Sequence, residues 1–208
     1  LNDASAFAVF NQSIEPQRSG SCILVASTSS DKTYQCNVIM QYFDKSGGWG
    51  VNVSIKDLGG NYAENISTSF SVNLLRGINI TPNSIGFPVV SPGGTNILSS
   101  QDTFVTNNGN YEGTLDVTAY NLTGEITSSE QIPAGNFRTA GLSGASSVCT
   151  TGTQLNDEGT TTITGSSLPR GAAGSNAENI TYCLTLVPTG ISTQTYSTNG
   201  AGSQAWVI

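Results

Sequence analysis

The sequence predicts an all-β protein built from two Ig-like β-sandwich lobes of antiparallel strands. Ser, Thr, Asn and Gly account for 95 of the 208 residues, and these residue types favour turns and short strands over helices. Apolar and polar residues alternate in several runs, which is the pattern of strands with one buried face. The strands recur about every ten residues, as in a sandwich. With 37% apolar residues, the chain can form a core and is not disordered.

The first third of the chain predicts a small β lobe. Residues 49–56 and 65–74 carry apolar side chains at alternating positions, which is typical of half-buried antiparallel strands. Residues 22–27 and 35–43 are apolar at consecutive positions, so we expect these strands to be more central. Together the four strands predict a β-meander that follows an apolar N-terminal stretch.

The pattern changes near Ile78 and predicts a larger second lobe. Short strands follow one another between Pro-Gly and Asn-Gly turns, with clear alternation at residues 115–120 and 180–186. We therefore expect an N-terminal strand at 1–14, a small β domain at 15–77 and an Ig-like sandwich at 78–208. One continuous sandwich with a long insertion is the alternative.

Composition excludes several classes of function. The net charge is −7 and there is no basic patch, so nucleic acid is not an expected partner. The chain has no His, which excludes zinc sites built on His and Ser-His-Asp triads. The 14 acidic residues form no recognisable motif, so we expect no catalytic site, cofactor or metal. An acid hydrolase using two carboxylates is the remaining enzymatic alternative.

The four cysteines predict disulfides. They form no C-x-x-C motif, and an even number of cysteines favours disulfides formed in an oxidising, extracellular compartment. Three pairings are open, and four buried thiols are the alternative. We favour the pairing in which each disulfide encloses one hairpin-sized or loop-sized segment, namely Cys22–Cys36 and Cys149–Cys183.

Six N-x-[ST] sequons are candidate N-glycosylation sites. The number carries little weight, because a composition this rich in Ser, Thr and Asn gives nearly as many by chance. Three of the asparagines, at positions 52, 65 and 179, are expected on the polar face of an alternating strand, where a glycan would leave the core undisturbed. The six are Asn11, Asn52, Asn65, Asn79, Asn121 and Asn179.

The chain opens with the apolar stretch "LNDASAFAVF". It is too short to span a membrane, which takes about 20 residues, and it lacks the features of a signal peptide. We interpret it as the end left after a signal peptide is removed. Because it is apolar on both faces, it requires burial within a sheet, either that of its own domain or that of a neighbouring chain. The side chains expected to fill the two faces are Ala4, Ala6, Ala8 and Phe10 on one and Phe7 and Val9 on the other.

Motifs within residues 78–140 resemble a pattern of secreted archaeal Ig-like domains. They are "ITPNSIGFPVV", "SPGGTN", "TNNGN" and "LDVTAYNLTG". With the N-terminal strand, the whole chain resembles subunits of archaeal surface filaments assembled by donor-strand complementation, the thread filaments of Sulfolobus-type archaea. Unlike type IV pilins, it has no long apolar N-terminal helix.

The resemblance implies an extracellular, glycosylated pilus-like filament of identical subunits joined head to tail. In such a filament, the N-terminal strand of one subunit completes the sheet of the next, and the assembly serves adhesion or biofilm formation. Two non-enzymatic alternatives stay open. One is a monomeric glycan-binding or surface-layer module, for which the chain has only two tryptophans, Trp49 and Trp206, with Trp49 expected on an apolar face. The other is a viral capsid sandwich.

Overall fold

A computed structural model describes residues 5–141, 146–198 and 205–208. The chain divides into two compact units, and the predicted all-β class is confirmed. Unit 1 comprises Leu1–Arg76 with Gly109–Tyr111, and unit 2 comprises Gly77–Asn108 with Glu112–Ile208. The N-terminal strand belongs to unit 1 and does not form a part of its own, and a short loop of the second lobe, residues 109–111, belongs to unit 1 as well.

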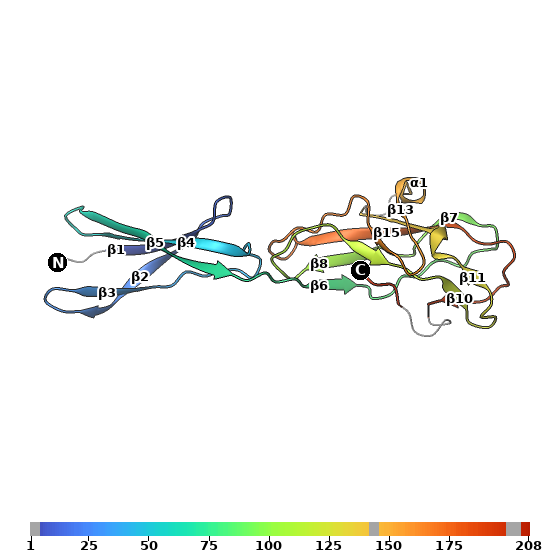
Figure 1. Ribbon diagram of the computed structural model, residues 1–208, viewed down its shortest axis with the longest axis horizontal. Helices are drawn as coiled ribbons and strands as arrows, with labels where there is room; N and C mark the ends of the chain where they lie inside the picture. Colours follow the sequence, from blue (N-terminus) through green and yellow to red (C-terminus); the bar gives the residue numbers. More distant parts are fainter. Residues whose placement is uncertain (1–4, 142–145, 199–204) are drawn as a thin grey trace. The chain divides into compact units, whose positions relative to one another are not determined.

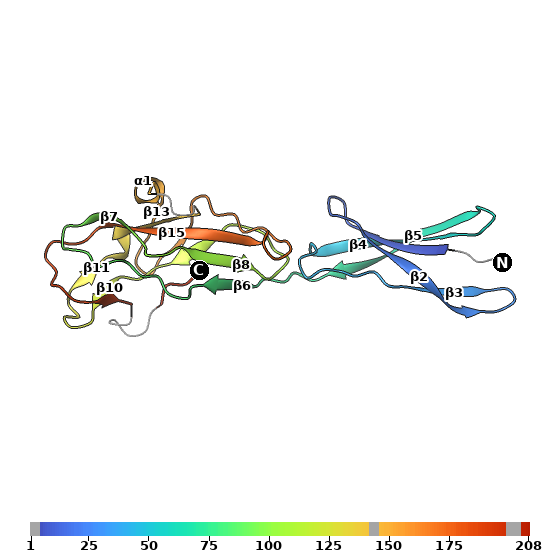
Figure 2. The ribbon, with the colours of Figure 1, turned by 180° about the vertical axis from the view of Figure 1, so that it is seen from behind.

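Unit 1 contains one five-stranded antiparallel sheet with the strand order β3-β2-β1-β4-β5. Both ribbon views show hairpins β2–β3 and β4–β5 flanking β1 (Figures 1 and 2). The first strand therefore lies at the centre, whereas a simple meander would leave it at an edge. The strands are β1 (Ser5–Asn11), β2 (Arg18–Ser27), β3 (Lys32–Cys36), β4 (Gly47–Lys56) and β5 (Tyr62–Val72).

One predicted strand of unit 1 is wrong. The expected central strand at 35–43 ends at Cys36, and β3 is an edge strand of the sheet. Residues 37–46 form an irregular segment instead, which we call the strap. The apolar residues of this segment suggested a strand, but contacts described below hold it against the sheet.

The loop at Gly109–Tyr111 is bound to the end of the first segment of unit 1 through the side chain and backbone of Asn110, and the Arg76 guanidinium lies over the Tyr111 ring. The Asn110 carboxamide accepts a hydrogen bond from the backbone N–H of Leu75 (2.7 Å) and donates one to the carbonyl of Asn73 (2.9 Å). The Asn110 backbone N–H also donates to the Leu75 carbonyl. Asn110 is buried, and its carboxamide makes the hydrogen bonds to Asn73 and Leu75 that a neighbouring backbone segment would make.

Unit 2 contains several small sheets around one large hydrophobic core, with a second, small buried cluster at the Cys149–Cys183 disulfide. The largest sheet has the order β13-β12-β15-β8-β6, with β7 also paired to β15; the smaller sheets are β11-β10-β16 and β14-β9. Its strands are β6 (Ile78–Thr81), β7 (Thr95–Leu98), β8 (Thr103–Asn107), β9 (Asp116–Thr118), β10 (Leu122–Gly124), β11 (Gln131–Ile132), β12 (Phe137–Ala140), β13 (Thr153–Gln154), β14 (Thr160–Thr162), β15 (Ala177–Leu186) and β16 (Tyr196–Ser197). Among the described residues of unit 2 there are also two short helical turns, a 3₁₀ turn at Ala134–Asn136 and α1 at Val148–Thr151.

The core of unit 2 is formed by side chains that come from different sheets. Val105 of β8, Phe137 of β12 and Tyr182 of β15 are fully buried, as is Val117 of β9 from another sheet. Near the C-terminus, Trp206 stacks edge-on against Phe137, with ring centroids 5.2 Å apart. The predicted terminal strand is reduced to a single β-bridge, in which Val207 pairs with Thr118. Unit 2 thus has a closed hydrophobic core of its own.

Candidate subunit-contact site

Strand β1 is hydrogen-bonded within unit 1 along both of its edges. It pairs antiparallel with β4 from Ser5 opposite Lys56 to Asn11 opposite Gly50. On its other edge, the residues from Phe7 to Phe10 pair with β2. Backbone groups on both edges are therefore satisfied, and β1 joins the two hairpins into one sheet.

The buried face of β1 is formed by two alanines and one phenylalanine. Ala6 and Ala8 are buried, and Phe10 is half-buried against Phe70, with ring centroids 4.9 Å apart. On the opposite face, Val9 is half-buried and Phe7 is 49% exposed. One expected face is therefore filled within unit 1 and the other is not, because no described segment covers Phe7. Ala4 lies outside the described residues.

The strap approaches the sheet closely beside Ala8. Gly20 of β2 lies directly opposite Ala8 in the register. A Cβ atom placed on Gly20 would lie 1.9 Å from the carbonyl oxygen of Asn37, a distance that no real Cβ contact has. Glycine is therefore required at position 20 for the strap to lie against this face.

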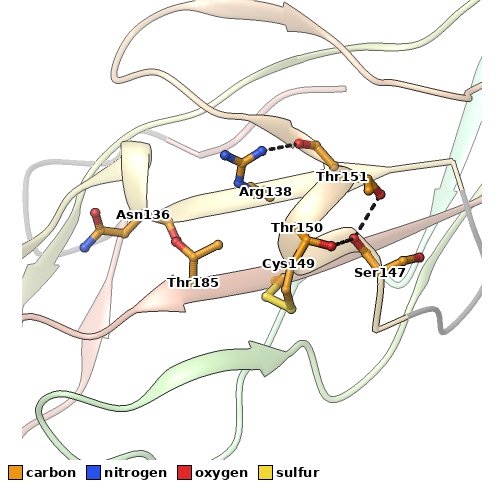
Figure 3. Close-up of a disulfide and its surroundings, with 9 residues drawn as sticks. Asn136, Arg138, Ser147, Cys149, Thr150, Thr151 and Thr185 are labelled. Atoms are coloured by element: carbon orange, nitrogen blue, oxygen red, sulfur yellow. Dashed lines mark hydrogen bonds between the residues drawn. A yellow bond between two sulfur atoms is a disulfide. The ribbon is translucent and has the colours of Figure 1, made fainter.

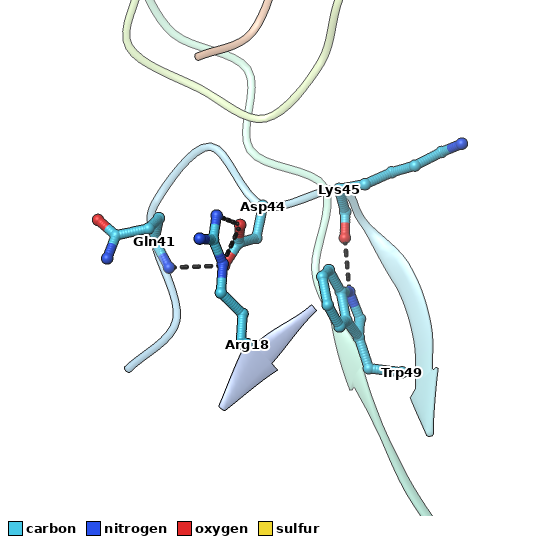
Figure 4. A network of polar contacts seen from close by, with 5 residues as sticks. All are labelled: Arg18, Gln41, Asp44, Lys45 and Trp49. Carbon is cyan, nitrogen blue, oxygen red and sulfur yellow. Dashed lines mark hydrogen bonds and ion pairs between the residues drawn. The ribbon is translucent and has the colours of Figure 1, made fainter. Parts of the chain in front are cut away.

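The far end of the strap is held by a charged pair and an indole (Figure 4). The Arg18 guanidinium donates to both carboxylate oxygens of Asp44, from Nε at 3.0 and 3.1 Å and also from Nη2. Asp44 is 2% exposed and also accepts from the backbone N–H of Gln41 at 2.7 Å. The hydrogen bond to Asp44 raises the pKa of Arg18. Fully buried Trp49 donates from its indole N–H to the carbonyl of Lys45 at 2.9 Å.

Sequence reasoning misses this clamp. Gly20, Arg18 and Asp44 stand in no motif, and the separation of 26 residues between the two charged residues is not informative. The one available signal is that charges are rare in this chain, at 10% of residues, so each charge in an otherwise apolar segment is a candidate for pairing.

The other half of the same sheet face is open. Val53, Ile55, Ala63 and Asn65 line a shallow hollow of about 240 Å³ over β4 and β5, together with parts of two neighbouring residues. Val53 is 38% exposed and Ala63 is exposed. The strap therefore covers the sheet at one end and leaves an apolar surface at the other.

Two of the predicted glycosylation sites are engaged in the fold. The Asn121 carboxamide accepts from the backbone N–H of Ala134 (2.7 Å) and donates to the Asp157 carboxylate (2.6 Å). Asn52, half-buried between β1 and β5, donates from Nδ2 to Glu64 at 3.0 Å. In both side chains the nitrogen that would bear a glycan is already a hydrogen-bond donor to a carboxylate.

The other four asparagines lie in different settings. Asn179 is half-buried on the long central strand β15. Asn11 and Asn79 are exposed, and Asn79 donates to the Thr81 hydroxyl at 3.5 Å. Asn65 is exposed on edge strand β5. Its register places it opposite Val53, so it lies on the apolar face and not on the polar face that alternation predicts.

Both disulfides of the favoured pairing are present. Cys22–Cys36 joins β2 to β3 at the point where the strap begins. Cys149–Cys183 joins α1 to β15 in unit 2 (Figure 3). Beside the second disulfide, Arg138 donates to the carbonyl of Gly152 at 2.7 Å, which fixes the end of α1.

One carboxylate of unit 2 has a strongly perturbed environment. Glu130 Oε2 accepts hydrogen bonds from the Ser192 backbone N–H and hydroxyl, the Gln194 amide and the Tyr196 hydroxyl, all at 2.6–2.8 Å. These donors, those of Ser192 first, lower the pKa of Glu130 to about 2. A carboxylate held ionised in this way is an acceptor that ties a loop together, not a proton donor at neutral pH. In the described part of the chain, no three His, Cys, Asp or Glu side chains lie close enough to hold a metal.

No family model, curated protein or solved structure matches this chain. Within the described residues, no helix is long and apolar enough to cross a membrane. The candidate site therefore depends on the geometry of β1 and its surroundings alone.

Proposed function

We propose that this chain is a structural subunit of an extracellular filament, in which β1 of one subunit occupies the place of β1 in the sheet of the next. The partners are identical chains joined head to tail, and the function involves no catalytic step or cofactor. An extracellular site of assembly agrees with the two disulfides. The proposal is consistent with the resemblance to donor-strand filaments drawn from the sequence.

The observation that carries the proposal is the central position of β1. It is the first strand in chain order, yet strands β2 and β4 both pair with it. Its removal would separate β2 from β4 and leave unpaired backbone groups on two strands, which is a strong template for another strand. A copy of β1 from a neighbouring chain fits that slot residue for residue.

The connection to β1 allows the exchange. In the described part of the chain, residues 12–17 are the one link between β1 and the rest of its sheet. Six extended residues reach about 20 Å, so the link can either turn back, as it does here, or continue into another chain. The turned-back form is held by a hydrogen bond from Glu15 N–H to the Gln12 carbonyl and by the Gln12 side chain, which donates to the carbonyls of Ser46 and Gly48. Because such an exchange passes from chain to chain without closing, it forms a fibre.

The alternative of a monomeric glycan-binding or surface-layer module has less support. Sugar-binding surfaces commonly offer an exposed aromatic face for stacking. Trp49 is fully buried under the strap, and Trp206 packs into the core of unit 2. Neither tryptophan side chain is placed to stack on a bound sugar.

A disulfide-trapping experiment tests the exchange. Phe7 lies directly opposite Ser54 across β1 and β4, so the pair Phe7→Cys and Ser54→Cys has the short separation that a disulfide needs. If β1 is exchanged, oxidised filaments give a ladder of covalent oligomers on a denaturing, non-reducing gel. If microscopy shows filaments and the trapped protein still runs as a monomer, the proposal is wrong.

A matched control uses the same position in β4. Ser54 also lies opposite Glu64 of β5, and this pairing does not involve β1. The pair Ser54→Cys and Glu64→Cys should therefore give a monomeric band in filaments and in isolated subunits alike. A ladder in this control would show that random surface cross-linking, and not exchange of β1, produces the oligomers.

A further inference from the structure

The chain reverses its direction between β1 and β2 in one tight turn. The backbone N–H of Glu15 donates to the Gln12 carbonyl at 2.7 Å, which places Ser13 and Ile14 at the two central positions of the turn. Turns favour Gly, Asn, Asp and Ser, whereas the β-branched Ile favours extended backbone. Ile14 is 79% exposed, so packing does little to hold this residue in the turn.

Pro16 concentrates the reversal in this turn. The residue before a proline is restricted towards extended conformations, so Glu15 contributes little to the change of direction. Pro16 itself has a fixed φ and no backbone N–H with which to extend the hydrogen bonding of the turn. The sequence Ile14-Glu15-Pro16 therefore favours an extended link between β1 and β2, and the turned-back form is adopted against this preference.

The Gln12 side chain anchors the end of β1 independently of the turn. Its Nε2 donates to the carbonyls of Ser46 (3.2 Å) and Gly48 (3.1 Å). Between these two residues, Gly47 has a φ of 112°, and a Cβ atom there would lie 3.1 Å from Nε2; glycine suits both conditions. Because Gln12 directly follows β1, a neighbouring chain that places its β1 in this sheet brings its own Gln12 to the same carbonyls.

The anchor and the turn therefore stabilise different things. The Gln12 anchor serves the β1 of either chain, whereas the turn at Ser13 and Ile14 exists only when β1 folds back into its own unit. We propose that residues 13–16 are a conformational device that disfavours the closed subunit and thereby directs β1 to a neighbouring chain. The inference rests on the exchange in the proposed function and adds the residues that decide its direction.

Ile14→Asn tests the device. The backbone of Ile14 is outside the left-handed region, so asparagine can take its place in the turn without a change of conformation. Ile and Asn lie near opposite ends of the strand-propensity scale. In the Phe7→Cys and Ser54→Cys protein, refolded at one fixed concentration and oxidised, the ratio of ladder to monomeric band should fall by about fivefold. An unchanged ratio overturns the inference.

Ile14→Thr is the matched control at the same position. Threonine is polar like asparagine but β-branched like isoleucine, so this variant should keep the ratio of the unsubstituted link. If Ile14→Thr lowers the ratio as far as Ile14→Asn does, the loss of an exposed apolar side chain is the cause, and the inference is wrong.

Gln12→Ala separates the anchor from the turn. It removes the anchor from both forms, so unit 1 should melt at a lower temperature while the ratio of ladder to monomer stays the same. If Gln12→Ala shifts the ratio as far as Ile14→Asn does, the anchor and not the turn decides which form is made, and the inference is overturned.

The turn also has a measurement that needs no filament. In isolated subunits, unit 1 of Ile14→Asn should melt at a higher temperature than unit 1 of Ile14→Thr, and an equal or lower temperature overturns the inference. Filaments that give the same ladder with and without Ile14→Asn refute this inference alone. Filaments that give no ladder, together with the higher melting temperature of Ile14→Asn, refute the exchange alone.

Discussion

Replacing Gly20 by alanine tests whether the strap presses on the sheet. The new Cβ would lie 1.9 Å from the carbonyl oxygen of Asn37. Because this oxygen belongs to the backbone, a change of side-chain rotamer cannot relieve the clash. Overpacking costs about 1–3 kcal/mol, and a contact this short with backbone places Gly20→Ala near the upper end. For a unit of this size, 1 kcal/mol corresponds to about 4–8 °C, so the melting temperature of unit 1 should fall by about 10–20 °C.

The assay follows Trp49 fluorescence during thermal unfolding. Trp49 and Trp206 are the two tryptophans of the chain, so a Trp206→Phe background leaves the buried indole that donates to the strap as the reporter. The matched control is Gly48→Ala, because a Cβ there meets no atom within 4 Å. That control should be neutral or slightly stabilising. If Gly20→Ala unfolds at the same temperature as Gly48→Ala, the close approach of the strap is refuted.

Three further predictions concern charge, pH and cross-linking. Asp44→Asn leaves Arg18 without its carboxylate partner and should lower the free energy of unfolding of unit 1 by about 1–3 kcal/mol in urea titrations. This is less than for a fully buried pair, because Arg18 is partly exposed to solvent. An unchanged midpoint contradicts the clamp. Hydrogen bonds donated by Ser192, Tyr196 and Gln194 lower the pKa of Glu130 from 4.5 to about 2. The ionised carboxylate therefore stabilises unit 2 above about pH 4.5, and this contribution is lost as the pH falls towards 2. Melting temperatures of Glu130→Gln should show a weaker dependence on pH in that window, and identical profiles would exclude the network. Replacing Cys149 and Cys183 together by alanine opens a loop of 34 residues and should cost unit 2 about 4 kcal/mol by calorimetry, whereas a loss below about 1 kcal/mol would contradict the chain-entropy account.

Local patterns of the sequence were sufficient to predict the strands that have one apolar face and one polar face. The alternation at residues 49–56 predicts the end of β4 at Lys56 and misses only its first two residues, and the spacing of Cys22 and Cys36 predicts a bridged hairpin. The strap shows where this reasoning stops. Its apolar residues predict a strand, but Arg18 and Asp44 meet across the fold and favour an irregular segment. Such a contact has no local signal.

The sequence predicted which residues of β1 form the candidate site, but not which residues of the neighbouring strands they pair with. The apolar residues of β1 indicate burial in a sheet, yet nothing in them shows that Ala8 would face Gly20 on one strand and Val53 on another. Alternation also places Asn65 on the wrong face. A one-residue shift between paired strands moves every following side chain to the other face, and here the shift arises from a β-bulge opposite Asn52.

The proposed exchange has an energetic consequence that follows from the contacts of β1. The strand buries two alanines and part of Phe10, so its attachment depends mainly on backbone hydrogen bonds to β2 and β4, each worth about 0.5–1.5 kcal/mol. A neighbouring β1 makes the same contacts, so the closed subunit and the filament differ only in residues 12–17 and in concentration. A short link gives a strand an effective concentration in the millimolar range for its own slot, which favours the closed form whenever a subunit folds alone. For β1 to leave its place in the sheet, its hydrogen bonds to both β2 and β4 must break, so either form persists once it is made. Under the proposed exchange, filament formation is therefore decided while the chain first folds, by whether a neighbouring β1 reaches the slot before its own strand closes.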